Sequence, residues 1–188
     1  MTPQDDSDVK IFGNIAETAD AGDLVALSSQ LDRQRSNGNI AKARALGKQL
    51  AILEQESSSG IDLYDLLGDT ELPAATVHQV RILLVFLAQT TLHKKLSTQL
   101  LSSCAVNAMY DKLIENSSSF YNDISDGAAF TFYYLSLRRD KNVPGSIGEN
   151  FAMLCGKDGD EYYKKLGTEI FINATELIEG IINEYHFE

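Results

Sequence analysis

Residues 74–94 read AATVHQVRILLVFLAQTTLHK, and the middle of this stretch, VRILLVFLA at 80–88, is apolar on almost every side of a helix. A helix that is apolar all round is typical of a protein interior. Pro73 stands immediately before the stretch, where proline favours a helix start. Residues 74–94 therefore predict a central, buried helix on which the other elements pack.

Helical spacing of apolar residues recurs on both sides of this central helix, and no segment alternates as a β-strand would. Further helices are predicted over 22–36, 40–56, 62–67, 97–116 and 118–139, and residues 9–20 are a candidate for one more short helix. With two more near the end of the chain, the fold class is all-α, a single-domain helical bundle of about six to eight helices. An N-terminal αα-hairpin is expected to pack on the central apolar helix core.

The N-terminal residues 1–8 are polar and are predicted to be disordered, and residues 9–56 form the helical hairpin region. The run Ser57-Ser58-Ser59-Gly60 is the best linker candidate in the chain. The main helical core covers 61–188 and is expected to form one domain together with 9–56.

Two helix boundaries stay open from the sequence alone. Residues 74–116 form either one long helix or two helices that part near Leu96, where the preceding His-Lys-Lys run favours a helix end. Residues 118–139, the aromatic stretch, either form one helix or start afresh at Asp126.

Two capping boxes predict the last two helix starts. Ser146-Ile-Gly-Glu149 is expected to open a short helix that ends near Cys155, and Asp158-Gly-Asp-Glu161 a long one. The long helix carries the cleanest apolar stripe in the chain, made of Leu166, Ile170, Ala174, Leu177, Ile181 and Tyr185.

The formal net charge of −11 limits the classes of partner. It argues against nucleic acid and against an anionic membrane surface, because both are bound mainly through basic faces. It suits docking onto a basic protein partner. The first ten residues, MTPQDDSDVK, lack the features of a signal peptide, so we expect a cytoplasmic protein whose two cysteines are free thiols.

No motif predicts catalysis, a cofactor or a metal site. The three histidines, His78, His93 and His186, do not pair with one another or with cysteine at the spacing of metal ligands. Cys104 lies on an inward helical face and Cys155 at a helix end, and neither position activates a thiol. No nucleotide-binding fingerprint is present, so no cofactor is expected.

The best candidate for a site is the stretch 126–163, where an aromatic helix ends in cations. Arg138, Arg139 and Lys141 offer forked or point-charge contacts to a carboxylate or phosphate, and Tyr133 and Tyr134 add hydroxyl groups one turn back. The simpler interpretation is that these cations only complement the helix dipole and that the aromatic residues fill the core.

The sequence therefore leaves three functional hypotheses. The first is a non-enzymatic protein-interaction or regulatory domain with an exposed apolar patch and a basic partner. The alternative is a protein or enzyme that binds an anionic metabolite in a pocket near residues 128–155, between the aromatic helix and the short helix that follows it. The third is self-association through the stripe of the C-terminal helix.

Overall fold

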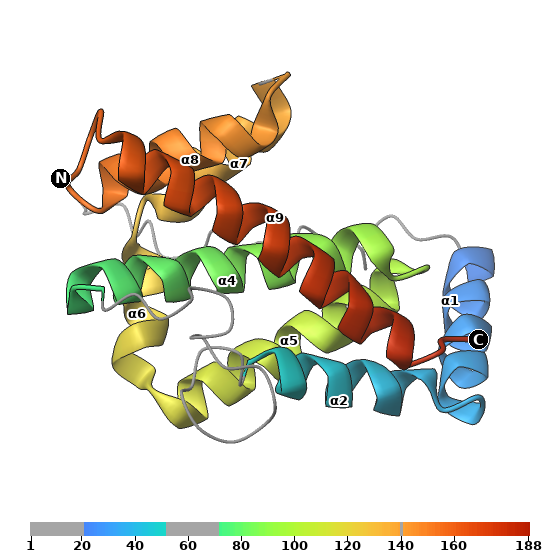
Figure 1. Cartoon of the computed structure of the whole chain (residues 1–188). Coiled ribbons are helices and arrows are strands. Elements are labelled where there is room, and N and C mark those ends of the chain that lie inside the picture. The colour runs from blue at the N-terminus through green and yellow to red at the C-terminus, as the bar shows by residue number, and fades with distance from the viewer. Residues whose placement is uncertain (1–20, 52–71, 140) are drawn as a thin grey trace, which may run out of the picture. The chain divides into compact units, whose positions relative to one another are not determined.

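The computed structural model describes residues 21–51, 72–139 and 141–188 (Figure 1). These residues form eight helices and no strands, which confirms the all-α fold. The helices are α1 (Ala21–Ser36), α2 (Asn39–Leu50), α4 (Ala74–Lys95), α5 (Gln99–Asn116), α6 (Ser118–Asp126), α7 (Ala129–Arg139), α8 (Val143–Leu154) and α9 (Glu161–Glu184). The predictions for 1–8, 9–20, 57–60 and 62–67 lie outside the described residues.

The chain divides into two compact units, Met1–Asn37 and Gly38–Glu188. In the first unit the structure describes α1, whose last turn carries Arg33 and Arg35 at the negative end of the helix dipole. All other described helices belong to the second unit. The two helices of the predicted N-terminal hairpin thus belong to different units.

Helix α4 is the centre of the second unit, as its sequence predicts. Every residue from Val80 to Ala88 is buried except Arg81, and α5, α7, α8 and α9 all pack against α4 (Figure 1). By length and composition α4 would also suit a membrane span, but 61% of that window is buried inside the helical core. Its apolar character is therefore accounted for by contacts within the unit.

The first open boundary is a break between two helices. Leu96 and Thr98 have extended backbones, and the Thr98 side chain accepts a hydrogen bond of 3.3 Å from the N–H of Leu101. This cap satisfies one of the N–H groups that a helix start leaves without a partner. The chain therefore turns after the cationic last turn of α4 and continues as α5.

The second open boundary is also a break, since the aromatic stretch forms α6 and α7. Helix α6 ends at Asp126, Gly127 has an extended backbone, and α7 begins at Ala129. The hydroxyl of Ser117 caps α6 by accepting a hydrogen bond of 3.3 Å from the N–H of Phe120. The break lets α6 pack on α5 while α7 packs on α4 and α8.

The predicted capping box at Ser146 is wrong, because α8 begins earlier, at Val143. The side chain of Asn142 accepts a hydrogen bond of 3.3 Å from the N–H of Gly145, and Pro144 occupies the first turn. Asparagine at the cap and proline just inside it are both strong helix-start residues. They place Ser146 inside the helix.

The capping box predicted for the last helix is displaced by two residues. Asp160, and not Asp158, caps α9 by accepting a hydrogen bond of 2.9 Å from the N–H of Tyr162. Gly159 has φ +79°, a left-handed conformation that glycine adopts without strain. The turn at Gly159 therefore precedes the cap.

A close crossing joins α8 to α9, and glycine makes it possible. A Cβ atom at Gly148 would lie 2.3 Å from the carbonyl oxygen of Lys164, and one at Gly167 would lie 2.6 Å from Cβ of Phe151. Neither position has room for a side chain, so the two backbones approach closely. The predicted apolar stripe of α9 packs against α8 and α4. Two of its residues, Ile170 and Ala174, are fully buried.

The last residues of the chain pack on α2. The buried side chain of Asn39 donates a hydrogen bond to the backbone oxygen of Glu188 and accepts one of 3.2 Å from its N–H. The hydroxyl of Tyr185 donates to Oε1 of Gln49 at 2.7 Å. These contacts join the C-terminal end of the second unit to α2, which is the first helix of that unit.

Candidate functional site

The two predicted tyrosines lie in different surroundings. Tyr133 is fully buried, and its ring centroid lies 5.2 Å from that of Phe86. Its hydroxyl has no hydrogen-bond partner among the described residues. Burial raises the pKa of Tyr133, and the nearby thiol of Cys155 adds to the effect. Tyr133 is thus part of the core and offers nothing to a ligand.

Tyr134 is half-buried and belongs to a chain of side-chain hydrogen bonds. The hydroxyl of Tyr110 donates to Oε1 of Gln89, and Nε2 of Gln89 donates to the Tyr134 hydroxyl oxygen at 3.0 Å. Burial raises the pKa of Tyr134, whereas the contact with Gln89 and the charge of Arg138 lower it. The hydroxyl is therefore held in place while its own proton remains available to an acceptor.

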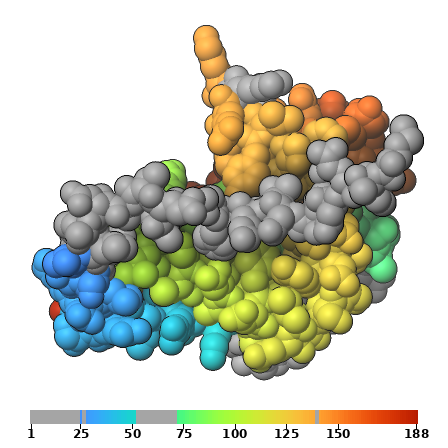
Figure 2. All heavy atoms as spheres, turned by 180° about the vertical axis from the view of Figure 1, so that it is seen from behind, coloured from blue at the N-terminus to red at the C-terminus, as the bar shows by residue number. Residues whose placement is uncertain are grey.

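Arg138 and Arg139 are the last two residues of α7, and Lys141 lies between α7 and α8. Arg138 and Lys141 are exposed, and the side chain of Arg139 lies outside the described residues. Figure 2 shows that atoms of this orange-yellow part of the chain project at the top of the view. Of the five predicted site residues, the structure places Tyr134 on a pocket and Arg138 close enough to influence its hydroxyl electrostatically.

That pocket lies on α4 between α7 and α9 and has a volume of about 420 Å³. Its lining residues are Leu87, Thr90, Thr91, His93 and Lys94 of α4, Tyr134 and Leu137 of α7, and Phe171, Thr175 and Glu179 of α9. All three helices belong to the second unit. No residue of α8 lines it, so it differs from the pocket predicted between the aromatic helix and the short one that follows.

The walls of this pocket are mainly apolar. Leu87, Leu137 and Phe171 each come from a different helix. The hydroxyls of Thr90 and Thr175 donate to backbone carbonyls one turn earlier in their own helices, at 2.8 and 2.6 Å. These threonines have thus satisfied their polar atoms, which suits them to an apolar wall.

One edge of the pocket is polar and carries charged side chains. His93 and Lys94, both exposed, stand in the last turn of α4. Glu179 is the one carboxylate in the lining, and Lys95 holds it in an ion pair of 2.7 Å. With Lys95, which does not line the pocket, two lysines stand beside one carboxylate here, on a chain whose formal net charge is −11.

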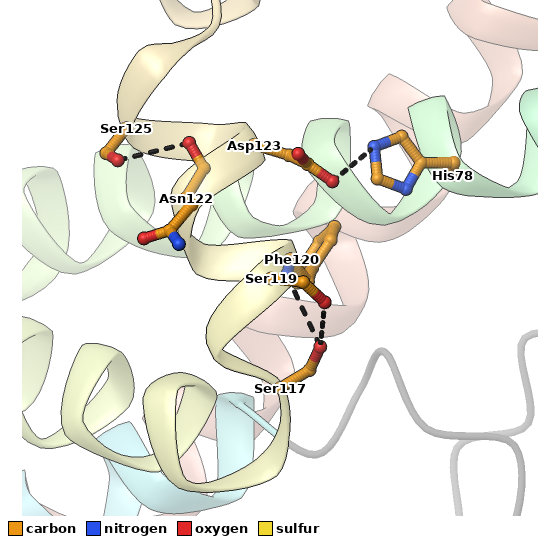
Figure 3. Close-up of polar contacts among 7 residues, drawn as sticks. All are labelled: His78, Ser117, Ser119, Phe120, Asn122, Asp123 and Ser125. Carbon is orange, nitrogen blue, oxygen red and sulfur yellow. Dashed lines mark hydrogen bonds and ion pairs between the residues drawn. The ribbon is translucent and has the colours of Figure 1, made fainter.

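A second polar cluster joins α6 to α4 (Figure 3). Nε2 of His78 lies 3.5 Å from Oδ2 of Asp123, and the His78 ring meets the ring of Phe120 edge-on. A cavity of about 460 Å³ lies beside this pair, and Asp126 also lines it. Both of its carboxylates are exposed, and the His78–Asp123 contact links α4 to α6, so we assign this cluster to packing.

The cysteines are free and partly buried. Burial raises the pKa of the Cys155 thiol to about 11, although a hydrogen bond with Thr76 acts in the opposite direction. At neutral pH this thiol is protonated and a poor nucleophile. The part of the chain that the structure describes contains no group of three His, Cys, Asp or Glu side chains that could hold a metal ion.

The sequence missed the contributions of α4 and α9 to the pocket. Phe171, Thr175 and Glu179 are spaced four residues apart and form one face of α9 beside its core stripe. Thr90 and Thr91 interrupt the apolar run of α4 at the level of this face. Both patterns are visible in the sequence, but only the packing of α7 and α9 on α4 brings them together.

Comparison of the chain with protein-family models, with curated proteins and with solved structures finds no match.

Proposed function

We propose that this chain is a non-enzymatic binding protein whose small-molecule ligand occupies the pocket between α4, α7 and α9. The observation that carries the proposal is the pocket itself, with its volume of about 420 Å³ and its apolar walls from three helices. Ligand sites in proteins are typically concave, largely apolar and roughly 300–1,000 Å³ in volume, with a few polar groups that orient the ligand. The Tyr134 hydroxyl and the charged side chains of the polar edge are such groups.

A binding role also agrees with the chemistry of the lining. The Thr90 and Thr175 hydroxyls are engaged by backbone carbonyls, and Glu179 is paired with Lys95, so none of the three is arranged as an activated nucleophile or a free base. The thiol of Cys155 is not among the lining residues. These features favour a role in holding a molecule over a role in converting it.

Methyl NMR spectroscopy tests the proposal directly. We expect 1-octanol, octanoate or octylammonium to shift the methyl resonances of Leu87 and Leu137 in a saturable manner. Thr175→Trp, which fills the pocket, should abolish the shifts. Asn173→Trp is the matched control, since Asn173 is exposed on the same helix and does not line the pocket. The proposal fails if no octyl compound shifts these methyls, or if Thr175→Trp leaves the shifts unchanged.

Binding of a protein partner remains a second candidate. Its support is the negative net charge and the exposure of large apolar side chains on α7, α8 and α9, namely Leu135, Met153 and Ile172, each between 37% and 41% exposed. Self-association through α9 would have to use the Ile172 face, because the apolar stripe is buried against α4 and α8. Light scattering of wild type and Ile172→Glu over a range of concentrations would detect it as an increase in mass that the substitution removes.

A further inference from the structure

We infer that the ligand of the α4–α7–α9 pocket is an amphipathic carboxylate, with an apolar body between the helices and its carboxylate at the edge formed by Tyr134, His93 and Lys94. The inference rests on the proposed function and adds the class of ligand. It follows from the position of the polar groups, from the charge at the edge and from the free proton of the Tyr134 hydroxyl.

The polar groups of α4 lie toward its C-terminal end, where His93 and Lys94 stand in the last turn. Gln89 and His93 are four residues apart on α4 and therefore share a face. The Tyr134 hydroxyl is bound to the Gln89 side chain, at 3.0 Å, and so lies beside that face. Leu87 and Phe171 supply apolar surface elsewhere in the pocket. A ligand with one polar end and one apolar end matches this division.

The charge at the edge favours an anion. Lys94 has no ion-pair partner among the residues that the structure describes, whereas the carboxylate of Glu179 is neutralised by Lys95 at 2.7 Å. The C-terminal end of α4 contributes roughly half a negative charge, which the full charge of Lys94 exceeds. Arg138 does not line the pocket, but its charge also influences the Tyr134 hydroxyl. Lys94, Lys95 and Arg138 therefore outnumber the one carboxylate in the lining, that of Glu179.

The hydrogen bonds of Tyr134 add a specific donor. Its oxygen already accepts from Nε2 of Gln89, whose Oε1 is engaged by the Tyr110 hydroxyl. A neutral hydroxyl whose oxygen is already an acceptor still has its proton to donate. A carboxylate oxygen is the natural acceptor for that proton, and a charge-assisted hydrogen bond is stronger than a neutral one. Gln89 is accordingly a positioning residue, which acts on the ligand through Tyr134.

Three octyl compounds that differ only in the head group test the inference by calorimetric titration of the wild-type protein. We expect octanoate to bind about fivefold to tenfold more tightly than 1-octanol at low salt, and octylammonium to bind most weakly. Half-molar sodium chloride should reduce the difference in affinity between octanoate and 1-octanol, because salt screens the exposed charges. If octanol binds as tightly as octanoate, or octylammonium binds most tightly, the assigned head group is wrong and the binding function stands. If none of the three binds, the proposed function itself is wrong.

Matched variants assign the head group to named residues. Lys94→Gln and Tyr134→Phe should each weaken octanoate about threefold to tenfold while changing octanol less than twofold. Gln89→Met should lower the ratio of octanoate to octanol affinity in the same way, which a purely structural role would not do. The controls are Lys165→Gln and Tyr162→Phe, both on exposed positions of α9 outside the lining. Equal losses for octanoate and octanol in the Lys94 and Tyr134 variants would overturn the assignment.

Discussion

At the scale of single residues, Tyr133 and Tyr134 illustrate how a helix separates neighbours in sequence. Successive residues of an α-helix point about 100° apart, so one tyrosine enters the core and the next reaches the pocket. The sequence predicted an aromatic surplus beside Arg138, and it also offered the simpler interpretation that the aromatic residues fill the core. The structure assigns the second role to Tyr133 and leaves Tyr134 on the pocket.

The hydroxyl of Tyr133 is a polar group that folding buries without a partner among the described residues. Such a group costs about 1–3 kcal/mol of desolvation, and its removal keeps the ring in place. We therefore expect Tyr133→Phe to raise the free energy of unfolding by about 1 kcal/mol, as measured by urea denaturation. Tyr162→Phe, at a residue that is 51% exposed, is the control and should change little. A clear loss of stability in Tyr133→Phe would show that the hydroxyl has a partner.

At the scale of elements, local sequence patterns predict where most helices lie along the chain. They do not predict which helices contact one another. The apolar run 80–88 correctly predicted the buried centre of α4. The α8 start was missed because Asn142 and Pro144 outweigh the box at Ser146. The pocket on α4 could not be predicted from the sequence, because the spacing of residues identifies the faces of a helix but not the neighbours that those faces meet. One face of each of α4, α7 and α9 contributes to the lining of the pocket, and no single face indicates a pocket by itself.

The crossing of α8 and α9 gives a prediction with a built-in control. Gly148→Ala would place a Cβ atom 2.3 Å from the backbone oxygen of Lys164, so the helices must separate. We expect a loss of about 2 kcal/mol or more in the free energy of unfolding. Gly180, in the same α9 helix, has nothing within 4 Å of its would-be Cβ, and Gly180→Ala should stabilise by about 0.5–1 kcal/mol. Thermal unfolding of both variants and of the wild type measures these changes in stability. Similar effects of the two substitutions would contradict the close crossing.

At the scale of the whole molecule, several groups keep their protons more firmly when the chain is folded. Burial raises the pKa of Tyr110 and Tyr133 above 10.0 and that of Cys155 from 9.0 to about 11. In each case folding favours the neutral form. The free energy of unfolding is therefore independent of these groups below their unfolded pKa values, and it falls as the pH rises from the unfolded toward the folded values.

We therefore expect the free energy of unfolding to fall steadily above about pH 9, by up to about 1.4 kcal/mol per pH unit for each group. Urea denaturation at intervals between pH 8 and pH 11 measures the fall. Tyr133→Phe should reduce the slope above pH 10, because it removes one of the protons that only the folded state retains. A wild-type stability that is flat across this range would contradict the burial of these groups.

The pairing of Asn39 with Glu188 has a consequence for the order of folding. It joins residues 149 positions apart, and so long a loop must lose much entropy before the contact can form. The contact is therefore expected late on the folding pathway, after α2 and α5 have met. Asn39→Ala should speed unfolding and leave the folding rate almost unchanged, as stopped-flow kinetics would reveal. The residues after α9 would then slow the unfolding of the protein without changing the rate at which it folds.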